Sequence, residues 1–85
     1  MRPFSVEFAA IAIRDAKRLD PQVARRIIEG IGRFAATGEG DVKKLKGQNN
    51  LRLRVGDWRV IFTVDEDAET INISRVLHRR EAYRN

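Results

Sequence analysis

The stretch LRLRVGDWRVIFTV, from Leu51 to Val64, decides the fold of this chain. In its first five residues the odd positions are apolar and the even ones are arginine. A strand with that alternation turns leucine and valine to one side and Arg52 and Arg54 to the other. Arg59 has the same out-of-phase relation to the apolar residues of the second half. Gly56-Asp57 between the halves predicts a two-residue hairpin turn, so the stretch forms two paired strands with arginines on one face.

The rest of the chain fits one α+β domain over residues 1–85, with a helical hairpin packed on one face of a small, mostly antiparallel sheet. Before the hairpin we predict a strand over Phe4–Phe8, a helix over Ala9–Arg18, a helix from Pro21 to Gly38 and a loop over Gly38–Asn50. The two hairpin strands are Leu51–Val55 and Trp58–Val64. After them we predict a strand over Thr70–Leu77 and a tail from His78.

The second helix has the clearest signals. Asp20 is a good N-cap and Pro21 a good first helical residue, and Gly38 supplies the stop. Four apolar residues recur at helical spacing between them and predict the buried side of the helix. These are Val23, Ile27, Ile31 and Phe34.

The composition excludes several classes of protein. With 42% hydrophobic residues a core is available, and the absence of cysteine excludes a disulfide framework and a thiolate metal site. No apolar run approaches the roughly 20 residues that span a bilayer. The first residues, MRPFSVEF, lack the apolar core of a secretory signal. We therefore expect a soluble, cytoplasmic protein with no membrane partner.

Positive charge is concentrated in the second half of the chain. The formal net charge is +5, and residues 43–85 hold ten basic side chains against six acidic ones. Four of those acids lie in the segment DEDAE, Asp65–Glu69, which we interpret as a solvated turn because it lacks the spacing and glycine of a calcium loop. A polyanionic partner fits this distribution, and so does a basic protein kept soluble by its surface.

No protein nucleophile stands out, because the chain has one histidine, no cysteine and no serine in a nucleophile-elbow context. Arg52, Arg54 and Arg59 are expected on the open face of the sheet. Acidic cross-strand neighbours normally balance basic strand residues, but the matching positions of the last strand, Arg75 among them, are not acidic. Uncompensated like charges destabilise a fold, so we expect a ligand to offset them, and arginine forks match phosphate oxygens.

The tail HRREAYR, His78 to Arg84, follows directly from the edge of the same sheet. Arg79 and Arg80 are placed to close over it. Tyr83 is interpreted as a stacking platform, a phenolic acid or base, or an aromatic anchor. His78 is either the one side chain that titrates near neutrality or a histidine hydrogen-bonded at the strand end, and the residues alone favour the second reading.

Together, LKG, LRLRVGDWRVIF, a final strand and HRREAYR resemble the RelE branch of the RelE/ParE superfamily of bacterial toxins. The order of elements is similar over essentially the whole chain: a strand, two helices and three strands. The specific part is RVGDWRVIF followed by HRREAY at this spacing. The resemblance implies a toxin of a type II toxin–antitoxin pair that cleaves messenger RNA, often in the ribosomal A site. Its implied partners are a cognate antitoxin, mRNA and the ribosome, and it implies no metal or other cofactor.

The resemblance also implies a basic active site. The family's strand cation falls on Arg52, the arginine after the hairpin aromatic is Arg59, and the C-terminal tyrosine is Tyr83. Asn50 stands where the best-studied pattern has a lysine, which raises His78 as a substitute for proton transfer. The candidate catalytic residues are Arg52, Arg59, His78, Arg79, Arg80 and Tyr83.

Other basic residues are candidates for holding RNA. The lysines before the hairpin either contact a nucleic-acid backbone or solvate a loop, and the sequence leaves both readings open. The candidate RNA-binding residues are Lys43, Lys44, Lys46, Arg54 and Arg75.

Two other readings remain. A ParE-like toxin has the same fold and inhibits DNA gyrase by protein contact, without a nuclease site, so the fold does not discriminate. A non-catalytic remnant that binds RNA or an antitoxin is the third. The basic and tyrosine residues of HRREAYR favour the nuclease.

Overall fold

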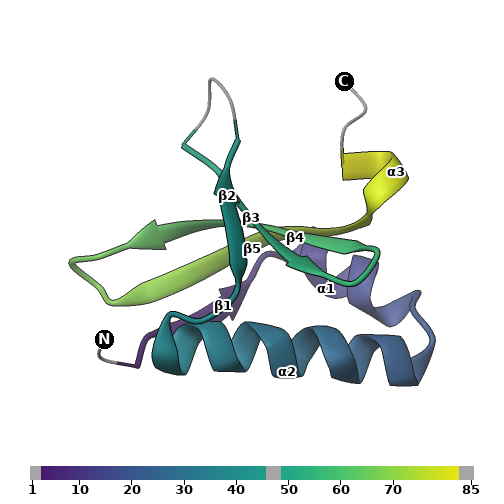
Figure 1. The fold of residues 1–85 in the computed structure, drawn as a ribbon, viewed down its shortest axis with the longest axis horizontal. Coiled ribbons are helices and arrows are strands. Elements are labelled where there is room, and N and C mark those ends of the chain that lie inside the picture. Colours follow the sequence, from purple (N-terminus) through teal and green to yellow (C-terminus); the bar gives the residue numbers. More distant parts are fainter. Residues whose placement is uncertain (1–2, 46–48, 83–85) are drawn as a thin grey trace.

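The computed structural model describes residues 3–45 and 49–82. Its centre is a twisted five-stranded sheet with the strand order β1-β5-β4-β3-β2 (Figure 1). Only the β1–β5 pair is parallel, so the predicted α+β class with a mostly antiparallel sheet is confirmed. The elements are β1 (Ser5–Phe8), α1 (Ala10–Lys17), α2 (Pro21–Thr37), β2 (Asp41–Lys44), β3 (Leu51–Val55), β4 (Trp58–Asp65), β5 (Thr70–His78) and α3 (Arg79–Ala82).

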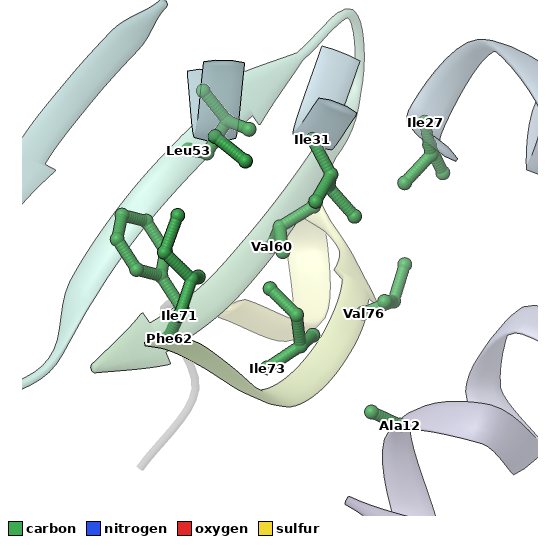
Figure 2. Close-up of a cluster of buried hydrophobic side chains, with 10 residues drawn as sticks. Ala12, Ile27, Ile31, Leu53, Val60, Phe62, Ile71, Ile73 and Val76 are labelled. Atoms are coloured by element: carbon green, nitrogen blue, oxygen red, sulfur yellow. The ribbon is translucent and has the colours of Figure 1, made fainter. Parts of the chain in front are cut away.

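The helical hairpin and the last short helix lie on different sides of the sheet. In Figure 1, α1 and α2 lie below the sheet and α3 stands above its right-hand end. Side chains from α1 and α2 meet those of the three central strands in one core, shown in Figure 2. The rings of Phe34 and Phe62 pack within it with centroids 5.3 Å apart. Among the described residues, none of the helices has the length and hydrophobicity of a membrane span.

Helix α2 begins and ends where the sequence predicts. The Asp20 side chain accepts a hydrogen bond from the Gln22 N–H at 2.9 Å, Pro21 is the first helical residue, and Gly38 ends the helix at φ 79°. That left-handed conformation suits glycine because it has no Cβ to clash. Ile27 and Ile31 are fully buried, as their helical spacing predicts.

The prediction of a loop over Gly38–Asn50 was wrong in part. Asp41–Lys44 forms a strand, β2, which pairs antiparallel with β3 at the edge of the sheet. Its only apolar side chain is Val42, so period-2 alternation is too weak to reveal it, and short charged strands are typical of sheet edges. The sequence prediction also left α3 unrecognised, as part of the tail.

A β-bulge in β5 explains the composition of the core. Ile61 of β4 pairs with Arg75, but the next residue, Phe62, pairs with Ile73, so Ser74 is left unopposed. Its hydroxyl donates to the Ile61 carbonyl at 3.1 Å. The extra residue shifts the alternation of the strand by one, so that side chains before and after the bulge point to opposite faces from those that strict alternation would give. Ile73 and Val76, three positions apart, therefore both face the core, with 1% and 3% of their surface exposed.

Candidate functional site

The three hairpin arginines share one face of the sheet. Arg54 and Arg59 stand directly opposite each other on β3 and β4, and Arg52 lies two positions along β3, diagonal to Arg59. This shared face is what the alternation predicts. The predicted exposure is wrong for two of them: Arg52 and Arg59 are buried, at 9% and 7% exposed, and only Arg54 is exposed.

The turn of the β3–β4 hairpin holds the guanidinium groups. The Gly56 carbonyl accepts hydrogen bonds from Nη1 of Arg59 at 3.0 Å and from Nε of Arg54 at 3.4 Å. Nη1 of Arg59 also donates to the Trp58 carbonyl at 3.0 Å. Because a backbone carbonyl of a tight turn moves little, Arg59 is fixed in place before any ligand binds.

Two buried guanidinium nitrogens have no hydrogen-bond acceptor among residues 3–45 and 49–82. They are Nη1 of Arg52 and Nε of Arg59. A buried donor left without an acceptor typically destabilises a fold by about 1–3 kcal/mol, and by more when it is charged. Both nitrogens belong to side chains on one face of the sheet, and guanidinium donors of this kind match the oxygens of anions such as phosphate.

Asp41 on β2 partly neutralises this face. Its carboxylate lies 3.8 Å from Nη1 of Arg52 and 3.9 Å from Nη1 of Arg54, distances of ion pairs rather than hydrogen bonds. The prediction that these arginines lack an acidic cross-strand neighbour was therefore wrong, and the reason is that β2 was not recognised as a strand. Asp41 pairs with Arg54 in the ladder. It supplies charge without completing the hydrogen bonds of Arg52.

The last helix brings the tail to the hairpin turn. The Arg79 N–H donates to the Asp57 carbonyl at 2.8 Å, and Nε of Arg79 lies 3.8 Å from the Asp57 carboxylate. His78 packs its ring edge-on against Trp58, with centroids 5.2 Å apart. Arg80 is exposed on α3. The predicted site residues of the tail that the structure describes thus lie beside the turn that holds Arg59.

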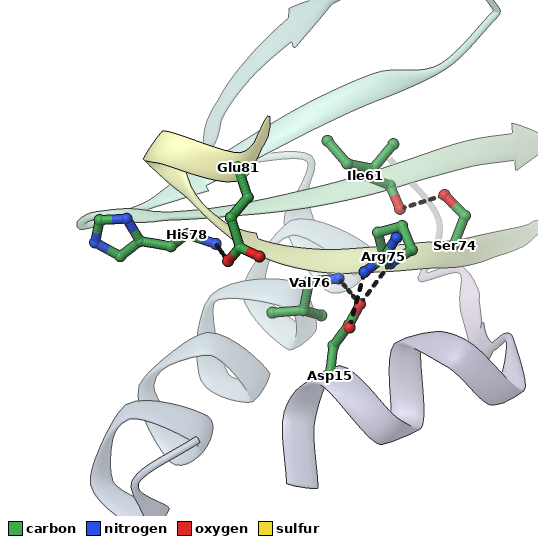
Figure 3. A network of polar contacts seen from close by, with 7 residues as sticks. All are labelled: Asp15, Ile61, Ser74, Arg75, Val76, His78 and Glu81. Atoms are coloured by element: carbon green, nitrogen blue, oxygen red, sulfur yellow. Dashed lines mark hydrogen bonds and ion pairs between the residues drawn. The ribbon is translucent and has the colours of Figure 1, made fainter. Parts of the chain in front are cut away.

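Arg75, a candidate RNA-binding residue, is paired with Asp15 of α1. Its Nε and Nη2 donate to the Asp15 carboxylate at 2.8 and 3.1 Å, and the Val76 N–H donates to the same carboxylate at 2.9 Å (Figure 3). The carboxylate therefore joins α1 to the stretch of β5 that extends beyond its pairing with β1.

The pKa values of this pair are shifted in opposite directions. Burial of Asp15 opposes its ionisation, but the hydrogen bonds from Arg75 and Val76 and the charges of Arg75 and Arg18 outweigh it, so the pKa of Asp15 lies below its ordinary value. The hydrogen bond to Asp15 raises the pKa of Arg75 above its ordinary value, against the opposing effect of burial. Both shifts favour the charged pair.

The predicted lysines lie at the edge of the sheet. Lys43 pairs with Arg52 in the ladder and Lys44 with Leu51, and both are exposed. Lys46 and Tyr83 lie outside the described residues. The acidic segment Asp65–Glu69 is a turn, as interpreted, with Oδ1 of Asp65 accepting from the Ala68 N–H at 3.0 Å. Within the described ranges no three His, Cys, Asp or Glu side chains gather as metal ligands do.

Four acidic residues that neighbour the arginines were not among the predicted site residues. Three of them, Asp15, Asp41 and Asp57, contact an arginine of another element, and Glu81 accepts a hydrogen bond from the His78 N–H. Asp57 had a signal, since an aspartate in a two-residue turn stands beside both strands. Asp15 and Asp41 had none, because their partners are 60 and 11 or more residues away in the chain.

The chain is similar to a known family and to several of its members. Residues 6–83 match the family model described as ParE toxin of the type II toxin–antitoxin system, parDE. The chain is 36% identical over 84 residues to toxin RelE3 of Methanocaldococcus jannaschii, and the alignment covers 92% of this chain and 93% of that toxin. It is 29% identical over 90 residues to toxin RelG of Mycobacterium tuberculosis, covering 96% and 98%.

The fold is similar to solved structures of toxins in complex with antitoxins. The RelB–RelE complex from Methanococcus jannaschii matches with a TM-score of 0.71 and 32% identity, over 89% of this chain and 93% of that one. The archaeal RelE–RelB complex from Pyrococcus horikoshii matches with a TM-score of 0.76 and 25% identity, over 92% and 97%.

Proposed function

The chain belongs to the RelE/ParE superfamily of type II toxins, and from that premise we propose that it is an endoribonuclease that cleaves messenger RNA without a metal. The observation that carries the proposal is the pair of buried guanidinium nitrogens on Arg52 and Arg59 that lack acceptors in the described part of the chain. A phosphate diester is the anion whose several oxygens suit two such donors.

The reaction uses the nucleophile of the RNA itself. The 2′-hydroxyl attacks the adjacent phosphorus, loses its proton, and expels the 5′-oxygen, which takes up a proton, leaving a 2′,3′-cyclic phosphate. The phosphorane that forms carries extra negative charge. Arg59, held by two carbonyls, and Arg52 stabilise that charge without rearranging when it appears, which is the arrangement that gives large rate effects.

The tail supplies the remaining groups. Arg79 and Arg80 of α3 lie beside the hairpin turn and add positive charge around the leaving oxygen. Tyr83 follows α3 directly in the sequence, and we assign proton transfer to its phenol. Arg54, Lys43, Lys44 and Lys46 hold the RNA strand on either side of the cleaved bond, and the cut falls on mRNA bound in the ribosome.

We also propose a dedicated antitoxin. The solved relatives are complexes of RelE with RelB, and this chain exposes three isoleucines on α1 and α2: Ile11, Ile13 and Ile28, at 47%, 42% and 54%. Ile13 and Ile28 line a shallow apolar groove with Phe8 and Ala16. A helical antitoxin segment whose apolar face fills this groove, with acidic residues near the arginines, fits both surfaces.

The second candidate function is inhibition of DNA gyrase, which the description of the matching family model favours. One cleavage assay separates the two. Purified chain is added to translated and to free mRNA, in buffer with and without excess EDTA for the free RNA. We expect cleavage ends with a cyclic or 3′-phosphate and no effect of EDTA. Intact RNA in both settings, with gyrase supercoiling blocked, would assign the chain to the gyrase inhibitors.

A further inference from the structure

His78 and Glu81 form a reciprocal pair of hydrogen bonds at the start of α3. Nδ1 of His78 accepts from the Arg80 N–H at 3.3 Å, and the His78 N–H donates to Oε1 of Glu81 at 3.3 Å, the second contact being drawn in Figure 3. His78 is the residue before the helix and Glu81 the third helical residue. This is a variant of the capping box: histidine stands in the place that serine or threonine usually takes, and its side chain accepts from the second helical N–H, that of Arg80, rather than from the third.

The hydrogen bond to Nδ1 determines what the imidazole can do. A ring nitrogen that accepts a hydrogen bond carries no proton, so in the neutral ring the proton is on Nε2. Trp58, edge-on at 5.2 Å, restricts rotation of the ring out of this position. With Nδ1 occupied and Nε2 protonated, the neutral ring has no nitrogen left to accept a proton from a 2′-hydroxyl.

We propose that His78 is a positioning residue of the tail: it caps α3 and thereby places Arg79 and Arg80, and it does not transfer a proton. This inference rests on the proposed RNA cleavage. Helix α3 has four residues, a single turn, which is not stable in isolation. In the described part of the chain it is held by the cap, by the Arg79 N–H bond to the Asp57 carbonyl at 2.8 Å, and by the longer ion pair of Arg79 with the Asp57 carboxylate at 3.8 Å. Losing the cap leaves the helix hinged on Asp57.

The first experiment compares His78→Ala with His78→Asn in the RNA-cleavage assay. Asparagine is a good N-cap and no base, so it restores the contact to the Arg80 N–H without restoring a titratable ring. We expect a loss of about 2- to 30-fold in kcat/KM for alanine, the fold-change that matches a lost cap, and near-normal activity for asparagine. Losing a general base typically lowers the rate about 100- to 10,000-fold. A loss of that size in both variants overturns the proposal.

Glu81 provides the matched test. Glu81→Ala removes the other half of the capping box and should lower kcat/KM by a similar factor, whereas Glu81→Gln, which can still accept from the His78 N–H, should not. The double variant with His78→Ala should lose little more than either single one, because both act on the same helix. Glu29→Ala, exposed on α2, is the control. Independent, multiplying losses would overturn the proposal.

A measurement without RNA separates this inference from the proposed function. The nitrogen shifts of the His78 ring in the neutral protein report its tautomer, and hydrogen exchange at the Arg80 amide reports the cap. We expect the proton on Nε2, and faster Arg80 exchange in His78→Ala but not in His78→Asn. A proton on Nδ1 overturns the inference even if RNA is cleaved. The expected NMR result in a chain that cleaves no RNA defeats the proposed function and leaves the cap established.

Discussion

Arg59 combines the features that a phosphate-binding side chain needs. It is 7% exposed, its Nη1 is tied to two backbone carbonyls, and its Nε has no acceptor within the described residues. A guanidinium in that position loses little conformational freedom on binding an anion, because its rotamer is already restricted. The same burial means that Arg59 also contributes packing through its aliphatic stem.

Replacing Arg59 should therefore separate activity from folding only in part. We expect Arg59→Ala to lower RNA cleavage by at least about 100-fold, the size of losing one fixed donor to a developing oxyanion, and to destabilise the fold by about 1–2 kcal/mol. Arg52→Ala should behave similarly. Lys43→Ala, at an exposed position on β2, should leave stability unchanged and lower cleavage far less than Arg59→Ala, and Glu29→Ala, exposed on α2, is the control that should affect neither. Cleavage kinetics and urea denaturation measure the two effects, and full activity of Arg59→Ala would place the site elsewhere.

Asp15 makes the stability of the fold depend on pH in acid. Its pKa is lowered in the folded protein from the ordinary 3.8, so the unfolded chain binds its proton first as the pH falls. The stabilisation of the fold by ionised Asp15 is complete above the pKa of Asp15 in the unfolded chain, and it is lost as the pH falls through the lower pKa of Asp15 in the folded protein. We expect Asp15→Asn to be less stable than the wild type by about 2–3 kcal/mol at pH 7, with the difference shrinking below about pH 4.

Urea denaturation of both proteins at pH 7 and pH 3 measures this difference. We expect Asp15→Asn to lose less stability than a variant that breaks a fully buried ion pair, because the Arg75 side chain is 39% exposed and water screens part of the interaction. A difference that stays constant between the two pH values would show that Asp15 stabilises the fold by its shape and neutral hydrogen bonds alone.

Among the elements, the β3–β4 hairpin organises the site most directly. The Gly56 carbonyl holds Arg54 and Arg59, and the Asp57 carbonyl holds the N–H of Arg79. Two adjacent peptide groups of one turn thus place the arginines of the sheet and those of α3 relative to each other. The turn depends on Gly56, whose φ of 60° suits glycine or asparagine.

We expect Gly56→Val to impair both folding and cleavage, and Gly56→Asn to impair neither strongly. No atom lies within 4 Å of a Cβ built at Gly56, so crowding is not the cause. The cause is backbone conformation: an L-residue in the left-handed region is disfavoured by roughly 1–2 kcal/mol, and more for a β-branched side chain. If strain moves the turn, cleavage by the folded protein falls as well. Equal stability of the two variants in thermal unfolding would contradict this account.

At the scale of the whole molecule, two chemically different surfaces are separated by the sheet. Helices α1 and α2 carry the exposed isoleucines on one side, and α3 with its arginines stands on the other (Figure 1). An antitoxin that covers both neutralises charge and buries apolar surface in one complex. The toxin alone keeps the two surfaces accessible.

Ile28 tests the apolar half of that interface. We expect Ile28→Asp to leave the toxin folded and active, because the side chain is 54% exposed, and to weaken binding of the co-encoded antitoxin by at least about tenfold. Ala36→Asp, on an exposed position of the same helix, is the matched control. Co-purification and growth rescue measure the effect. Unchanged rescue by the antitoxin in cells expressing Ile28→Asp would move the interface away from this groove.

Local signals were sufficient for the elements that have strong caps, turns or periodicity. The ends of α2, the Gly56-Asp57 turn and the shared face of Arg52, Arg54 and Arg59 follow from interactions between residues at most a few positions apart, which the order of residues alone specifies. Such contacts need no knowledge of the rest of the fold, and they were predicted correctly.

Only the tertiary structure decided burial and charge pairing. The bulge at Ser74, the edge strand β2, and the partners of Arg52 and Arg75 all depend on contacts between segments distant in sequence. Alternation shows which residues share a face, but it does not show what covers that face or which acid lies across from it. For this reason the sequence determined where the arginines stand on their strands, and the packing of the chain determined that Arg52 and Arg59 are buried, each with one donor that has no acceptor among the described residues.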